Sequence, residues 1–95
     1  MNAELITRFR NIAADGSGIE MVVWKMPESV PPSNHCYKYR LVFLAGGIRV
    51  VGFDNERGKG DHQHLSEVEL PYQFFDVETL FADFITEVEK WKNAG

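Results

Sequence analysis

The sequence predicts an α+β fold, an antiparallel β-sheet of four to five hairpin-connected strands with one long C-terminal amphipathic helix packed on it. Three observations predict this fold. Runs of β-branched and aromatic residues recur over residues 3–54, turn residues separate these runs, and apolar residues at helical spacing follow only after residue 76. The chain has 95 residues, which predicts a single globular domain over residues 1–95.

The N-terminal part of the chain predicts one hairpin and a loop. Residues 3–9 alternate loosely between apolar and polar side chains, and residues 19–26 (IEMVVWKM) are rich in β-branched and aromatic residues. The DGSG sequence at 15–18 is a turn signal between them. Residues 27–35 contain three of the four prolines, which lack the ladder donor and therefore predict a loop.

The central part of the chain predicts a second hairpin. Residues 37–45 and 48–54 are two β-rich runs, and Gly46-Gly47 between them is typical of a two-residue turn. Such a turn pairs Ala45 with Ile48, Phe43 with Val50, Leu41 with Gly52, and Tyr39 with Asp54. We therefore expect residues 35–39 and the stretch from Asp54 onward to share one edge of the sheet.

The C-terminal part of the chain predicts a short edge strand and then a helix. Residues 67–74 (EVELPYQF) resemble an edge strand that Pro71 ends. Asp76 is a good helix N-cap. The apolar residues that follow lie on one helical stripe: Val77, Leu80, Phe81, Phe84, Ile85, Val88 and Trp91.

Charge and composition limit the classes of function. The net charge is −4, but residues 1–64 hold eight Lys/Arg against seven Asp/Glu, so phosphate contacts would come from this part. The single cysteine excludes an internal disulfide, and no apolar run reaches the roughly 20 residues of a membrane span. We expect a cytoplasmic protein without a membrane partner.

The stretch Asp54–His64 concentrates polar side chains that suit chemistry on RNA. His62 and His64 could transfer protons near neutral pH, with Glu56 or Asp61 orienting an imidazole. Arg57 and Lys59 could bind phosphate, and Gly58 and Gly60 would let the backbone approach an anion. The supporting residues would be Asp54, Asn55, His35, Tyr37 and Tyr39. Such a set could cleave RNA with no metal and no other cofactor.

Two other interpretations of the same stretch stay open. His62 and His64, an i, i+2 pair on one face of a strand, could hold a divalent metal ion together with Asp61, Glu56 or His35. Alternatively, the chain could be a non-enzymatic protein-interaction module, in which the polar loop or the acidic helix face binds a partner and the motif only holds the loop in shape.

Nearly the whole chain resembles the TumE family of bacterial toxin–antitoxin systems. The resemblance lies in YKYRLVF, GGIRVVGFDNERGKGDHQH and PYQFFDVETLFADFITEVEKW. Phe53 stands where the family pattern has a tyrosine, and Gln63 where it has a basic residue. The resemblance implies a small cytoplasmic toxin that pairs with a helix-turn-helix antitoxin. It also implies functional importance for the motif residues, which are Asp54, Asn55, Glu56, Arg57, Gly58, Lys59, Gly60, Asp61, His62 and His64.

Overall fold

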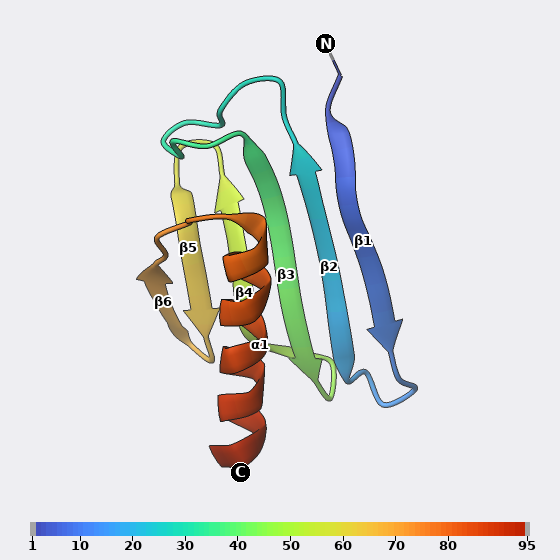
Figure 1. The fold of residues 1–95 in the computed structure, drawn as a ribbon. Coiled ribbons are helices and arrows are strands. Elements are labelled where there is room, and N and C mark those ends of the chain that lie inside the picture. The colour runs from blue at the N-terminus through green and yellow to red at the C-terminus, as the bar shows by residue number, and fades with distance from the viewer. Residues whose placement is uncertain (1, 95) are drawn as a thin grey trace.

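The computed structural model describes residues 2–94, which form a six-stranded antiparallel sheet and one helix (Figure 1). The strands lie side by side in chain order: β1 (Glu4–Ile12), β2 (Gly18–Lys25), β3 (Tyr37–Ala45), β4 (Ile48–Glu56), β5 (Gly60–Leu65) and β6 (Val68–Pro71). The helix α1 (Val77–Ala94) crosses one face of the sheet. The predicted α+β class is confirmed, with six strands instead of four to five.

The additional strand comes from the polar stretch after Phe53. The sequence predicts a loop there, yet β4 continues to Glu56 and β5 begins at Gly60. Only Arg57, Gly58 and Lys59 form the turn between these strands. Asp54 pairs with His62 across the β4–β5 ladder, and the polar side chains of this hairpin alternate between the two faces of the sheet. A run without apolar residues therefore forms strands here and not a loop.

The β3–β4 register contains a β-bulge that the predicted turn did not anticipate. Ala45 pairs with Ile48 as predicted, but Phe43 pairs with Val51, and Arg40 rather than Tyr39 pairs with Asp54. The ladder skips Val50, which is the extra residue on β4. The predicted register is therefore wrong beyond the turn by one residue. A one-residue slip moves every following side chain to the other face.

The helix packs on the face of the sheet that carries the apolar side chains. Asp76 accepts a hydrogen bond from the Thr79 backbone N–H (2.7 Å), which confirms it as the N-cap. Leu80, Phe84 and Val88 are buried against β3 and β4, and the rings of Phe53 and Phe84 meet edge to face. We call this the helix face, and the opposite side, which no helix covers, the open face (Figure 1).

Candidate functional site

Successive residues of the β4–β5 hairpin point to opposite faces of the sheet. Phe53 contacts the helix residue Phe84, so its neighbour Asp54 points to the open face. His62 and His64 pair with Asp54 and Gly52 and share that open face. Asn55 and Asp61 pair with each other and point the other way. The motif is thereby divided into two polar groups on opposite sides of the sheet.

The group on the helix face is a hydrogen-bonded network around the Asp61 carboxylate. Asp61 accepts hydrogen bonds from the Ser33 hydroxyl, from the Tyr39 hydroxyl (2.6 Å) and from His35 Nε2 (2.7 Å). His35 Nδ1 accepts the Tyr37 backbone N–H (3.1 Å), so the proton of the neutral imidazole resides on Nε2. Burial and the bond to Asp61 raise the pKa of the Tyr39 hydroxyl far above its ordinary value.

Asn55 completes this network, because its side-chain amide hydrogen-bonds the backbone of β3 where the backbone pairing with β4 has ended. The β3–β4 ladder ends at Arg40 and Asp54. Beyond it, Asn55 Oδ1 accepts the Tyr39 backbone N–H (3.0 Å), and Asn55 Nδ2 donates to the Tyr37 carbonyl (2.7 Å). The side-chain amide therefore makes the two bonds that a neighbouring backbone would make. We call Ser33, His35, Tyr39, Asn55 and Asp61 the buried network. It ties the Pro-rich loop to the sheet.

The group on the open face consists of Asp54, His62 and His64, and we call it the histidine cluster. One potential ligand atom from each residue lies within 4.8 Å of the others. The two imidazole rings meet edge to face, with centroids 4.9 Å apart. His62 is buried, whereas Asp54 and His64 are partly exposed. A recess of about 340 Å³ opens beside His62, lined also by Lys59, Glu69 and Pro71.

His62 is held in one orientation by both ring nitrogens. Nδ1 lies 3.0 Å from the Gly60 carbonyl oxygen, which can only accept, so Nδ1 carries a proton. Nε2 lies 2.5 Å from Asp54 Oδ1, a contact that has ion-pair distance without hydrogen-bond geometry. Among residues 2–94, Asp54 Oδ1 is the one buried side-chain nitrogen or oxygen atom that has no hydrogen-bond partner. A buried carboxylate oxygen in that state calls for a proton or another cation beside it.

His64 has a different environment from His62. Burial, and then the positive charge of Arg49, lower the pKa of His64 below its ordinary value. The imidazole is therefore mostly neutral at pH 7 and can accept a proton. The cluster combines this neutral imidazole with a second imidazole, His62, that lies against the Asp54 carboxylate.

The side chains of the histidine cluster, two imidazoles and a carboxylate, are also of the types that bind a divalent metal ion. An imidazole that donates one N–H to a backbone carbonyl and presents the other nitrogen is the usual arrangement of a metal-ligating histidine. The Gly60 carbonyl gives His62 that arrangement. Asp54 Oδ1 would supply the carboxylate oxygen and His64 a second imidazole. Three protein ligands leave a position for water or substrate, as in catalytic zinc sites.

The remaining predicted residues lie around the turn between β4 and β5. Glu56 and Arg57 are exposed, and Arg57 borders the loop of residues 26–31. Lys59 Nζ is paired with Glu69 (2.8 Å). The Gly58 N–H donates to the Pro31 carbonyl (2.8 Å). Gly60 lies against Pro32, where an added Cβ would come within 3.1 Å of the proline ring. These four residues and Gly60 form the rim of the hairpin, and Asp61 orients His35 instead of His62 or His64.

The open face next to the cluster carries cationic side chains from several strands. Arg10 and Arg40 share the carboxylate of Glu20 (2.9 and 3.1 Å), which places all three on this face. Arg40 pairs with Asp54 across the ladder. By the alternation of the strands, Arg8 and Lys38 also belong to this face. A polyanion could therefore contact the face beside the histidines.

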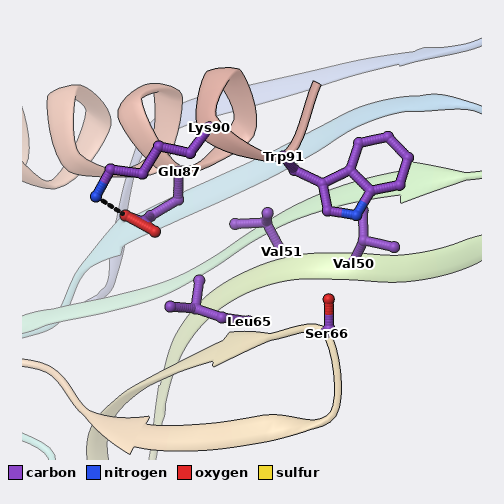
Figure 2. A pocket seen from close by; sticks show the side chains of 7 residues that line it. All are labelled: Val50, Val51, Leu65, Ser66, Glu87, Lys90 and Trp91. Atoms are coloured by element: carbon purple, nitrogen blue, oxygen red, sulfur yellow. Dashed lines mark hydrogen bonds and ion pairs between the residues drawn. The ribbon is translucent and has the colours of Figure 1, made fainter. Parts of the chain in front are cut away.

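A pocket with an apolar wall lies elsewhere, between the C-terminal turns of α1 and the β5–β6 turn (Figure 2). It has a volume of about 210 Å³, and Val50, Val51, Leu65 and Trp91 form its apolar wall. Its only charged side chains, Glu87 and Lys90, are paired with each other at 3.1 Å. This pocket has no group that transfers a proton at neutral pH, so we place the candidate site at the histidine cluster.

Sequence reasoning missed two features of the site. It grouped Asp54 with Tyr39, whereas Asp54 belongs with His62 on the other face. It also did not identify Arg49, which lies beside His64. The bulge at Val50 explains both omissions, because the register beyond it determines which residues share a face. Gly52, a glycine in the middle of a strand, was the one available signal of a close approach.

Comparison with known proteins agrees with the motif. A family model described as Toxin TumE matches residues 2–92, which is nearly the whole chain. No curated protein and no solved structure matches it. No helix within residues 2–94 is long and apolar enough to cross a membrane. The family match extends from β1 to the last turns of α1 and includes both polar groups of the β4–β5 hairpin. The chain therefore belongs to the TumE toxin family, and as such it is the toxin component of a toxin–antitoxin pair.

Proposed function

We propose that this toxin is a ribonuclease that cleaves RNA by acid–base chemistry at the histidine cluster, without a metal ion. The observation that carries the proposal is the contact of two imidazoles, one of them against a carboxylate, on an uncovered, partly cationic sheet face. His64 is the proton acceptor because burial and Arg49 favour its neutral form. In this proposal His62 is the proton donor, and the Asp54 carboxylate at 2.5 Å and the Gly60 carbonyl orient its imidazole.

The proposed step balances with RNA alone. His64 takes the proton of a ribose 2′-hydroxyl, and the 2′-oxygen forms a bond to the adjacent phosphorus. The bond from phosphorus to the 5′-oxygen breaks, and His62 gives its proton to that oxygen. The products are a 2′,3′-cyclic phosphate and a 5′-hydroxyl end. General acid–base catalysis of this kind contributes roughly 100- to 10,000-fold to a rate.

The family supports a proposal for the partner and for the place of action. A toxin of a toxin–antitoxin pair is held inactive by its antitoxin, which we propose to be a helix-turn-helix protein. The acidic C-terminal helix offers that partner a negatively charged face. The cytoplasm, where RNA and antitoxin meet the toxin, is the proposed location.

The test uses the purified chain, a single-stranded RNA, and the same strand with 2′-deoxyribose throughout. We expect cleavage of the RNA in excess chelator, cyclic phosphate ends, and no cleavage of the deoxy strand. His64→Ala and His62→Ala should each lower the rate at least 100-fold while circular dichroism shows a folded protein. Equal activity of folded His64→Ala and wild type would refute the acid–base assignment. If the antitoxin co-purifies but the free toxin turns over no RNA, the protein-interaction module is the better interpretation.

A second candidate function is metal-dependent hydrolysis at the same cluster, favoured by the unpartnered Asp54 Oδ1. In that case excess chelator abolishes cleavage and one divalent ion restores it. A readout that does not depend on activity is the visible absorption of Co²⁺ added to the protein. Co²⁺ bound at one equivalent by wild type, and not by Asp54→Ala or His64→Ala, would replace the metal-independent mechanism with this one.

A further inference from the structure

The backbone conformation of Gly52 does not require glycine, so the reason for a glycine lies in the side chains around it. Six glycines have a positive φ, and Gly52 is not among them. It lies in the middle of β4 between Val42 and His64, where a glycine weakens a strand. The position is explained by space: a Cβ here would lie 3.0 Å from Arg49 Cδ, 3.5 Å from Arg49 Nε and 3.7 Å from His64 Cβ. The side chain of Arg49 therefore crosses the open face over Gly52 and next to His64.

Arg49 differs from its cationic neighbours in lacking a carboxylate partner. Arg10 and Arg40 share Glu20, and Lys59 is paired with Glu69. Within residues 2–94 no carboxylate lies at ion-pair distance from the Arg49 guanidinium. Its stem lies over Gly52, the residue that pairs with His64 across the ladder. An exposed, unpaired guanidinium held beside a candidate reactive imidazole is an anion-binding arrangement.

We propose that Arg49 binds the scissile phosphate of the RNA, and that Gly52 positions it by leaving room for its side chain. This inference rests on the proposed ribonuclease function. The guanidinium can donate two parallel hydrogen bonds to the non-bridging phosphate oxygens while His64 Nδ1 or Nε2 faces the 2′-hydroxyl. Those oxygens gain negative charge as the fifth bond to phosphorus forms, so a fixed cation beside them stabilises the transition state more than the substrate.

The bulge places Arg49 in this position. Arg49 pairs with Leu44 on β3, directly before the skipped residue Val50, and the ladder resumes at Val51. Bulges redirect side chains and are frequent next to functional sites. The long arginine stem then spans from the bulge to Gly52. A lysine at 49 would keep the charge but lose the fork that matches two phosphate oxygens.

The variants that test this proposal separate charge from position. Arg49→Ala should lower kcat/KM by roughly 100-fold, the usual effect of removing one donor to a developing oxyanion. Arg49→Lys should lie between that variant and wild type. Gly52→Ala keeps every charge and its backbone suits alanine, yet its methyl crowds the arginine stem, so it should lose activity, though less than Arg49→Ala. Lys92→Ala, which removes one positive charge from the helix side, is the matched control and should keep wild-type activity.

A binding measurement gives a second readout. A 2′-O-methylated strand cannot be cleaved by this mechanism, and its affinity can be measured by fluorescence anisotropy over a range of salt concentrations. Arg49→Ala and Gly52→Ala should bind more weakly, and Arg49→Ala should reduce the slope of log K against log salt by about one. If wild type cleaves RNA while both variants match Lys92→Ala in cleavage and binding, the role of Arg49 is refuted and the ribonuclease stands. If wild type cleaves no RNA, the proposed function itself fails.

Discussion

The buried network and the histidine cluster come from alternate residues of the same hairpin, and they differ in how fully their polar atoms are used. The side chains of Asn55 and Asp61 make five hydrogen bonds, none longer than 3.0 Å, to Ser33, His35, Tyr37 and Tyr39. Asp54, His62 and His64 leave a carboxylate oxygen without a donor and an imidazole partly exposed. The comparison teaches that a polar motif can stabilise the fold with one face and keep its chemistry available on the other.

The largest stability effect should follow from a change in the buried network. Asn55→Ala leaves the buried Tyr39 N–H and the half-buried Tyr37 carbonyl without partners. We expect the free energy of unfolding to fall by about 3 kcal/mol, since each unsatisfied buried group costs about 1–3 kcal/mol. Urea denaturation at pH 7 measures this change. If the free energy of unfolding fell by no more than it does for a substitution of an exposed residue, the two hydrogen bonds from Asn55 to the β3 backbone would not stabilise the fold.

Asp61→Asn should produce the next largest loss of stability. The amide keeps the shape, but its NH₂ group faces donors that previously met a carboxylate oxygen. We expect about 1–3 kcal/mol of destabilisation, the cost of leaving a buried donor unpaired. The same urea titration measures it, with Glu67→Gln as a control for the lost charge, because Glu67 lies in the exposed β5–β6 turn.

Asp54→Asn should distinguish the histidine cluster from the buried network, because Asp54 belongs to the cluster alone. Asp54 Oδ1 makes one contact at ion-pair distance, to His62, and no hydrogen bond, so Asp54→Asn should cost less stability than Asp61→Asn, which changes a carboxylate with three hydrogen bonds. RNA cleavage should nevertheless fall, because His62 loses the carboxylate that orients its imidazole. Parallel urea and cleavage measurements decide this. A large loss of stability with unchanged cleavage would assign the cluster to the fold instead.

Alkaline pH should lower the free energy of unfolding by a smaller amount, through the Tyr72 hydroxyl on the helix face. Burial, and then the bond to Asp83, raise the pKa of the Tyr72 hydroxyl above its ordinary value. In the unfolded chain this hydroxyl ionises near pH 10, so above that pH the unfolded state binds fewer protons and stability falls as pH rises. Tyr72→Phe should reduce the loss of stability between pH 8 and pH 10.5. An unchanged slope would contradict the Tyr72–Asp83 contribution.

The elements of the fold were predictable because each had a local signal. Asp76 and the apolar stripe after it define the helix, and Gly46-Gly47 with its flanking β-rich runs defines the central hairpin. The polar strand β5 was not predictable by hydrophobic alternation, because its open-face side chains are histidines and its helix-face side chains begin with Asp61. Its structure depends on pairing with β4 and on hydrogen bonds to the Pro-rich loop, which are tertiary contacts.

The composition of the site was predictable, but its division between two faces was not. The sequence singles out the stretch Asp54–His64 with its two histidines, but it predicts a loop where the structure has the β4–β5 hairpin. It cannot show which carboxylate meets which imidazole, since Asp54 meets His62 and Asp61 meets His35 only through the observed register. Arg49 lies outside the motif and approaches His64 across Gly52, a relation that no spacing in the sequence encodes.

The bulge at Val50 sets the phase of everything that follows it in the hairpin. If Val50 were instead paired with Phe43 in a straight ladder, Asp54, His62 and His64 would turn toward the helix, and Asn55 and Asp61 would reach solvent. Deletion of Val50 would remove the extra residue and leave Arg49 paired with Leu44 and Val51 with Phe43, so every side chain of the motif would keep its face. A related chain that has the same number of residues between the Gly-Gly turn and the aspartate therefore needs the same bulge to build the same site, whereas a chain one residue shorter builds it with a regular strand.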